Sequence, residues 1–276
     1  MNDKIITARL TLKFEKDDEN KTYLASQYYK LPLQVLPPHY QDDDGTAFVY
    51  LLNPSGGIMQ GDHLYTEAYL GNQSSVVITT PSSTKYYKME DEAAEVENVF
   101  YVGEKAVLEY LPEHSVPFNH ADVVQRNKYH IASDSTLIAL DCVTSGRKAT
   151  GEHFGYKRFC SKSSIWVDEK LVLLDCMDIM PEAFNVKNKG IMERNDITAG
   201  MYLYQKGAAD QLVAEIRENF RPVGKIKAGA TKLSDDLVII RIMGRSIIDY
   251  KDTVALLWNQ CRMTMLGKKA VRFRKY

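Results

Sequence analysis

Apolar and polar residues alternate along most of this chain, which is the period-two pattern of half-buried β-strands. KIITARLTLKF and TYLASQYYKLPLQVL flank the charged segment EKDDENK, and together they predict a β-hairpin. TAFVYLLN and HLYTEAYL flank a glycine-bearing turn and predict a second hairpin. Further segments of the same character are SSVVITTP, AVLEYLP, STLIALDCV, SIWVDEKLVLLDC and DDLVIIRIM.

Two late segments change to the period of a helix. AADQLVAEIRENF places Leu212, Ile216 and Phe220 four residues apart, on one helix face. SIIDYKDTVALLWNQCRMTMLGKK begins with a pattern like a capping box, Ser246 followed by Asp249, and Gly267 fits its end. Its longer apolar stripe consists of Ile247, Tyr250, Val254, Leu257, Cys261 and Met265.

These patterns predict a mainly β protein with a large multi-stranded β body, either a helical stack of strands or barrel-like. Two α-helices are expected near the C-terminal end. No linker rich in proline, glycine or serine interrupts the chain, and we find no repeat that can be aligned. We therefore expect residues 1–276 to form a single domain.

Composition and charge narrow the class of protein further. The chain has 276 residues, of which 45% are apolar and 26% charged, and its net charge is −1. This balance is ordinary for a soluble globular protein, and it supplies no basic field for nucleic acid or an anionic membrane, so neither partner is expected. The four cysteines form no CxxC pair and no signal segment is visible, which favours the cytoplasm.

The segment NPSGGIMQGDHL (53–64) resembles a phosphate-binding loop only in its glycine spacing. A P-loop requires lysine and a hydroxyl residue after its second glycine, followed by a helix. Asp62 and His63 stand there instead, and the next residues alternate like a strand. We expect the chain alone to bind neither GTP nor ATP, and the loop to hold Asp62 in a fixed position.

Two more polar clusters are candidates for chemistry. DCVTSGRKATGEHF brings Asp141, Arg147, Glu152 and His153 together around two glycines. Such a group is an acid/base pair, a metal site or a solvated turn with an Arg–carboxylate pair, and the last is favoured. TTPSSTKYYKMED places Lys85 among hydroxyl residues, where a structural lysine is favoured over a nucleophilic Ser/Lys pair.

Known catalytic signatures do not occur in the sequence. There is no GxSxG, no HExxH and no Cys/His spacing of a zinc site. Residues and patterns alone therefore favour a binding or scaffolding role over catalysis, without naming the partner.

Four motifs, taken in order, resemble the UreD family of urease accessory proteins, also called UreH. They are LLNPSGGIMQGDHL, TTPSSTKYYK, LEYLPEHSVPFNHADVVQ and SGRKATGEHF. The late segment RIMGRS…LLWNQCRMTMLGKKAVR is also similar to that family's C-terminal helix and arm. The resemblance covers nearly the whole chain.

This resemblance implies a nickel-insertion scaffold rather than an enzyme. It implies three partners: a UreF-type accessory protein, a UreG-type GTPase and the urease apoprotein. GTP would belong to the GTPase alone, and this chain would hold no tightly bound cofactor. Ni²⁺ would pass transiently along carboxylates and water, because a closed cage of His and Cys ligands would trap it.

The resemblance also implies which residues carry the function. Asp62, Asp141 and Glu152 are expected to converge on one polar passage and attract Ni²⁺, without forming a stable metal site. Lys85 and Arg147 are expected to hold those carboxylates by ion pairing. The C-terminal arm, including Arg272, Phe273, Arg274 and Tyr276, is expected to contribute to the UreF-type partner surface.

Two rival classes stay open at this point. One is a cytoplasmic β-fold hydrolase that uses Glu152 with Asp141 or His153. The other is a β-sandwich adhesion or carbohydrate-binding module, which the lack of a signal segment disfavours.

Overall fold

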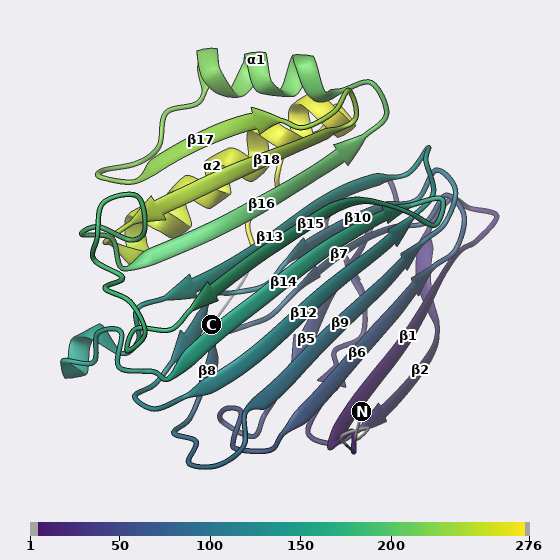
Figure 1. Cartoon of the computed structure of the whole chain (residues 1–276). Helices are drawn as coiled ribbons and strands as arrows, with labels where there is room; N and C mark the ends of the chain where they lie inside the picture. Colours follow the sequence, from purple (N-terminus) through teal and green to yellow (C-terminus); the bar gives the residue numbers. More distant parts are fainter. Residues whose placement is uncertain (1–4, 274–276) are drawn as a thin grey trace.

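The computed structural model describes residues 5–273, and it is mostly β, with 46% strand and 13% helix. Two large sheets face each other and form a solenoid-like body, while the α-helices α1 (Ala209–Asn219) and α2 (Ile247–Leu266) lie together at one end (Figure 1). The predicted class, a mainly β protein with two helices late in the chain, is confirmed. Within the described residues, no helix has the length and apolarity needed to cross a membrane.

The first sheet has seven strands, with a parallel centre and antiparallel edges. Its spatial order is β15 (Lys170–Ile179), β14 (Arg158–Val167), β12 (Asp122–Ile131), β9 (Ala94–Val102), β6 (His63–Leu70), β1 (Ala8–Lys16) and β2 (Thr22–Lys30). The predicted hairpin at the N-terminus is confirmed, because β1 and β2 pair antiparallel.

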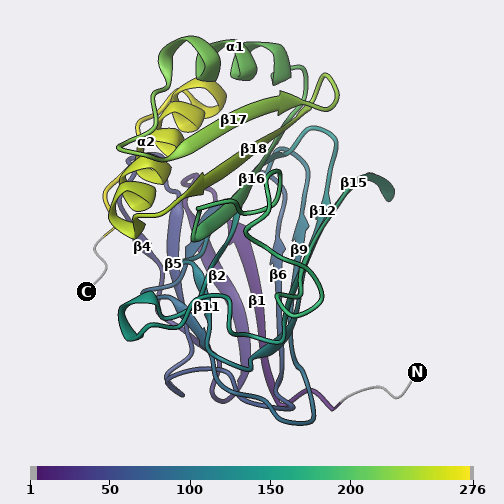
Figure 2. The same ribbon diagram turned by 60° about the vertical axis from the view of Figure 1, so that its left-hand side comes forward.

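The second sheet faces the first and extends beyond it toward the helices (Figures 1 and 2). Its main path is β17 (Lys227–Lys232), β18 (Leu237–Gly244), β16 (Ile197–Gln205), β13 (Thr136–Thr144), β10 (Val107–Leu111), β7 (Ser75–Thr79), β5 (Ala47–Leu52) and β3 (Gln34–Val35). Short strands join it at the side: β4 (His39–Tyr40), β8 (Thr84–Tyr86) and β11 (Ser115–Pro117).

In the centre of the body, from β5 to β14, the chain winds back and forth between the two sheets. β5, β7, β10 and β13 are parallel neighbours in the second sheet, and β6, β9, β12 and β14 are parallel neighbours in the first. The predicted hairpin across the glycine turn is therefore wrong, because β5 and β6 belong to different sheets. The alternation of their side chains was read correctly, but each strand pairs with a strand one coil away.

Other strands also differ from the expectation. SIWVDEKLVLLDC is not one strand but the tip of an antiparallel hairpin, β14 and β15, which turns at Asp168 and Glu169 with positive φ. Four strands, β9, β12, β16 and β17, were not expected from the sequence pattern. Because β9 and β12 form the centre of the first sheet, the regular winding of the chain between the two sheets could not be predicted without them.

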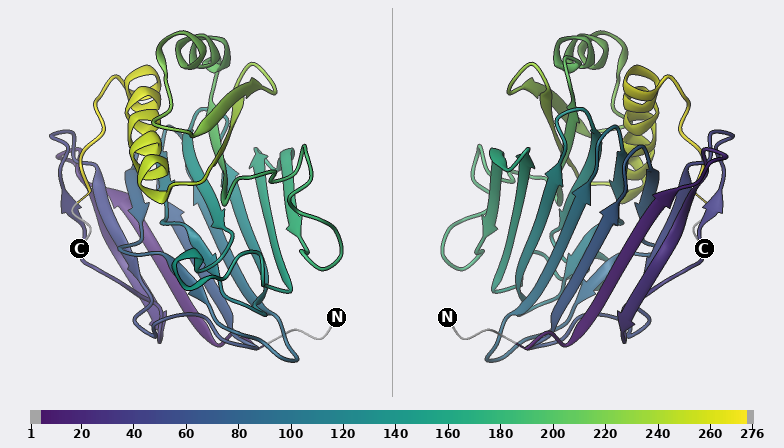
Figure 3. Two further views of the ribbon diagram at one scale, coloured as in Figure 1. Left: turned by 90° about the vertical axis from the view of Figure 1, so that its left-hand side faces the viewer. Right: turned by 90° about the vertical axis from the view of Figure 1, so that its right-hand side faces the viewer.

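Two hydrophobic clusters hold the layers together. One lies between the facing sheets, and the other lies between the second sheet and the helices α1 (Ala209–Asn219) and α2 (Ile247–Leu266). Figure 3 shows α1 and α2 at the same end of the molecule. The predicted ends of α2 are confirmed: the Ser246 hydroxyl accepts a hydrogen bond from the Asp249 amide at 3.2 Å, and Gly267 has φ +67°.

A buried ionic cluster fastens α2 to the body. Arg262 is fully buried, and its Nε lies 3.0 Å from Oε2 of Glu109, which is also fully buried, on β10. The Trp258 indole donates to Glu109 at 2.5 Å, and Arg262 also pairs with Asp42. Lys268, just beyond the helix, reaches Asp42 at 3.2 Å. The end of α2 is therefore fixed by charged contacts as well as by apolar packing.

Candidate functional site

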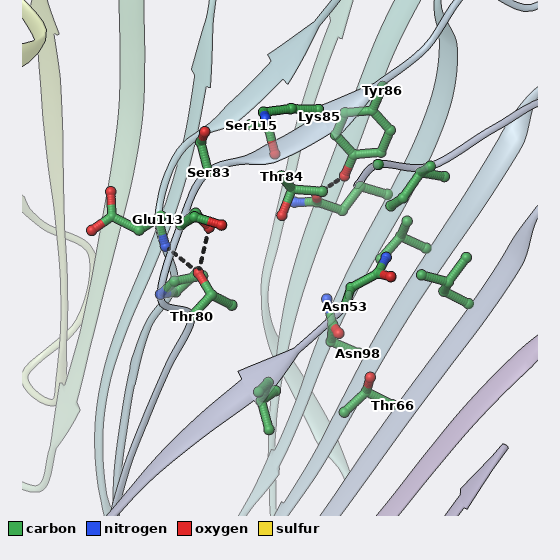
Figure 4. Close-up of a pocket in the computed structure, with 18 of the residues that line it drawn as sticks. Asn53, Thr66, Thr80, Ser83, Thr84, Lys85, Tyr86, Asn98, Glu113 and Ser115 are labelled. Carbon is green, nitrogen blue, oxygen red and sulfur yellow. Dashed lines mark hydrogen bonds between the residues drawn. The ribbon is translucent and has the colours of Figure 1, made fainter. Parts of the chain in front are cut away.

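A cavity of about 370 Å³ opens between the two sheets, beside the glycine loop. Its wall combines residues 53, 54 and 56–58 of that loop, residues 80–86 up to the end of β8, and side chains of β12 and β13. Figure 4 shows that Thr66, Asn98 and Asn53 face the same space as Tyr86 and Thr84. The cavity thus brings together segments that are far apart in the sequence.

The glycine loop forms the wall because it bends sharply between sheets. Gly56 and Gly61 have φ of +79° and +73°, values that favour glycine. A Cβ at Gly57 would lie 2.4 Å from the Tyr87 ring, so only glycine allows this close approach. The loop leads from β5 into β6 with no helix after it, which is unlike a phosphate-binding loop.

A row of polar side chains crosses the inner face of the first sheet. Thr66, Asn98, Asn127 and Ser163 are in register on β6, β9, β12 and β14. The Asn98 amide donates to the Asn127 carbonyl at 2.9 Å, and both side chains line the cavity. An inner sheet face normally carries apolar residues, so this row gives the cavity a polar wall.

Asp141 on β13 is the buried carboxylate of the cavity. Gln125 Nε2 donates to one of its oxygens at 2.8 Å, and the Ser161 hydroxyl donates to the other. The Gln125 carbonyl accepts from the Tyr86 hydroxyl at 3.1 Å. Burial raises the pKa of Asp141, although the hydrogen bonds from Ser161 and Gln125 oppose that shift. Uncharged donors hold this carboxylate, so its charge has no compensating cation among these contacts.

The other expected site residues lie elsewhere or point differently. Lys85 lines the cavity, but within residues 5–273 its ammonium group makes no ion pair. Arg147 pairs with Glu152, with Nε 3.0 Å from Oε2, and its guanidinium lies over the Phe118 ring. Arg147 therefore forms an ion pair with one of the expected carboxylates, whereas Lys85 forms none among the described residues.

Asp62 and Glu152 belong to connections at the same end of the body but not to the cavity wall. Asp62 accepts from the Met59 amide at 2.8 Å and so closes the glycine turn. Four connections lead from the second sheet to the first at this end: β5 to β6, β8 to β9, β11 to β12, and β13 to β14. Backbone hydrogen bonds join neighbouring connections. Asp62 lies in the connection from β5 to β6, and Glu152 lies in the connection from β13 to β14. Of the five expected residues, the cavity therefore contains Asp141 and Lys85.

The arrangement offers little to a hydrolase built on Asp141, Glu152 and His153. Asp141 faces the cavity, Glu152 is engaged by Arg147, and His153 pairs with Asp196. Among the described residues, no group of three or more His, Cys, Asp or Glu side chains is arranged to hold a metal ion.

The C-terminal arm is partly used inside the chain. Phe273 stacks on Trp258 with centroids 4.8 Å apart, and its ring edge meets Phe48 and Tyr50. Arg272 is exposed. The remaining expected partner residues, Arg274 and Tyr276, lie outside the described residues.

Sequence reasoning missed Gln125, Asn127 and Ser161, although a signal was present. In DVVQRNKYHI the buried positions alternate, and Gln125 and Asn127 share their face with Val123 and Tyr129. Polar residues at core-facing positions of a strand are costly unless they are hydrogen-bonded. They indicate either a buried network or the wall of a cavity.

Comparison with known proteins adds the family. A family model described as UreD urease accessory protein matches residues 7–275. The urease accessory protein UreD of Bacillus cereus is 28% identical over 260 residues, which cover 94% of this chain and 95% of the relative. That of Citrobacter koseri is 29% identical over 261 residues, covering 95% and 88%. A putative UreD homologue of Escherichia coli O157:H7 is 31% identical over 237 residues, covering 86% and 91%.

Proposed function

The chain belongs to the UreD family of urease accessory proteins and has a role in urease maturation; from this premise, we propose that it is a non-catalytic scaffold that passes Ni²⁺ toward urease. It bridges the urease apoprotein to a UreF-type accessory protein, which connects it to a UreG-type GTPase. Ni²⁺ is a transient cargo here, and GTP is bound by the GTPase alone.

The buried carboxylate of the cavity carries this proposal. Asp141 is held by uncharged donors, so it attracts a cation without a competing positive partner in its own hydrogen bonds. Amide and hydroxyl groups of the inner row supply weak oxygen ligands or hold ligating water. A site with one carboxylate and neutral groups binds a divalent ion loosely, which suits transfer.

The substitution Asp141→Asn tests the passage. It keeps the size of the side chain but removes the negative charge, so the complex with partners should assemble while urease activation falls. Glu90→Gln is the matched control, because Glu90 is an exposed carboxylate paired with Lys88 outside the cavity. Equal urease activation by Asp141→Asn and the control, at equal complex yield, would refute the passage through Asp141.

The location of Asp62 and Glu152 leads to a separate expectation for these two residues. Each is held by local bonds in a connection, so Asp62→Asn and Glu152→Gln should act on activation through the shape of these turns. If both variants reduce activation while the melting temperature and complex assembly are unchanged, then the negative charges of Asp62 and Glu152 themselves act on the path of Ni²⁺.

The partner surface is proposed to include Arg272, in the arm after α2, together with the outward face of α2. Ile248 and Leu256 on that face are exposed by 70% and 51%. Arg272→Ala should weaken co-purification with the UreF-type protein without changing stability. Phe273→Ala should instead destabilise the end of α2, because it removes the stack on Trp258. If Arg272→Ala leaves partner affinity unchanged, then the exposed part of the arm does not belong to the interface.

A further inference from the structure

An ion pair joins helix α2 to a residue that lines the cavity. Glu113 lines the cavity, and in Figure 4 its carboxylate points away from the other labelled side chains. Lys251, in the second turn of α2, places its Nζ 3.0 Å from Oε2 of Glu113. Tyr250, its neighbour, lies against Cys142, a second residue of the cavity wall. The first turns of α2 therefore contact the wall directly.

The two members of this ion pair differ in their surroundings. The side chain of Glu113 is 11% exposed, whereas that of Lys251 is 52% exposed. His114 Nδ1 lies 3.5 Å from the same carboxylate oxygen, and the Glu113 amide donates to Thr80. Glu113 is thus fixed in the wall, while the ammonium group stands on a flexible stem in contact with water.

Such a pair is easily exchanged. An ion pair with one half-exposed member contributes little net stability, because water and side-chain entropy offset the attraction. A divalent ion at the same carboxylate gains more Coulomb energy than a single ammonium charge. The lysine ammonium is a compact point charge, unlike the planar guanidinium of arginine, which can form two parallel hydrogen bonds to a carboxylate. Lys251 can therefore leave Glu113 without breaking a bidentate contact.

We propose that Lys251 is a displaceable counter-ion that neutralises Glu113 until Ni²⁺ reaches the α2 side of the cavity. The Lys251 ammonium then moves into solvent, and the Glu113 carboxylate becomes the next oxygen ligand of the divalent ion. No covalent bond changes in this exchange. The inference rests on the proposed passage of Ni²⁺, and it assigns the step at which the ion leaves Asp141 for the helical end.

The test measures Ni²⁺ binding by the isolated, tag-free full chain, using nickel chloride in equilibrium dialysis. Lys251→Met should raise the affinity about three- to tenfold, because it removes the competing positive charge. Adding Glu113→Gln to that variant should abolish the gain. Lys148→Met is the matched control, since Lys148 is also exposed and pairs with a carboxylate, Asp196, that does not line the cavity.

Unchanged affinity in Lys251→Met would overturn the proposal, and so would a gain that survives Glu113→Gln. Thermal unfolding of each variant shows whether the fold is intact. The outcome is separable from that of the proposed function. Normal urease activation with Asp141→Asn would refute the passage of Ni²⁺ through the cavity. Unchanged Ni²⁺ affinity in Lys251→Met alone would refute the role of Lys251 as a counter-ion but not the passage.

Discussion

Replacing Arg262 with methionine should destabilise the protein more than any change to an exposed ion pair. Arg262 and Glu109 are both fully buried, and 3.0 Å separates their nearest charged atoms. At an effective dielectric constant of about 20, their attraction is about 5 kcal/mol. Methionine fills much of the same volume but leaves Glu109 with the Trp258 indole as its remaining partner in this cluster.

The expected cost of Arg262→Met is about 3–5 kcal/mol, the usual penalty for leaving one charge of a buried pair uncompensated. For a chain of this size, such a loss lowers the melting temperature by roughly 6–20 °C. Urea denaturation, followed by tryptophan fluorescence, measures the free energy of unfolding. Arg126→Met is the control, because Arg126 pairs with Glu95 at 2.7 Å but its side chain is 34% exposed.

A second substitution separates charge from packing. Adding Glu109→Gln to Arg262→Met removes the stranded charge, so part of the lost stability should return. The stabilising role of the buried charge is refuted if Arg262→Met lowers the free energy of unfolding no more than Arg126→Met does. It is also refuted if adding Glu109→Gln to Arg262→Met lowers the free energy of unfolding further instead of restoring part of it.

Three further predictions concern other contacts. Arg158 holds the pKa of Asp178 below its usual range. The contact therefore stabilises the fold above about pH 4, and this stabilisation is lost as the pH falls through the lowered pKa. Arg158→Met should move acid unfolding, measured by circular dichroism, to higher pH. Gly57→Ala should cost about 1–3 kcal/mol and distort the cavity mouth, because its Cβ would meet the Tyr87 ring; a melting temperature equal to that of the unmodified chain would contradict the close approach. Arg147→Met should leave the midpoint of urea denaturation nearly unchanged, because the Arg147 side chain is 43% exposed; a clear shift of the midpoint would show a role in the fold.

Local features of the sequence predicted local features of the fold. Ser246 and Gly267 marked the ends of α2 because capping depends on residues within one turn. The pairing of β5 with β6 failed for the opposite reason. Alternation shows that a segment is a strand, but it does not show which strand lies beside it, and here the parallel partner is about one coil away.

The candidate site was found in part, for similar physical reasons. Asp141 was among the candidates because it begins a polar cluster around two glycines, and because the family resemblance implied it. Its partners, Gln125 and Ser161, come from two other strands and could be recognised only once the register across the first sheet was known. Glu109 and Arg262 are 153 positions apart, so no local pattern links them.

The ionic cluster at the end of α2 also bears on how the chain folds as it is synthesised. Glu109 and Asp42 leave the ribosome long before Arg262, which lies near the end of the chain and binds both. Until α2 emerges, these two carboxylates and the part of the second sheet's outer face that α2 covers lack their partners. We therefore expect a nascent chain to pass through a stage in which the coiled body is folded but open on this side. Truncation before Arg262 would hold the protein permanently in that stage, with an apolar surface available for aggregation.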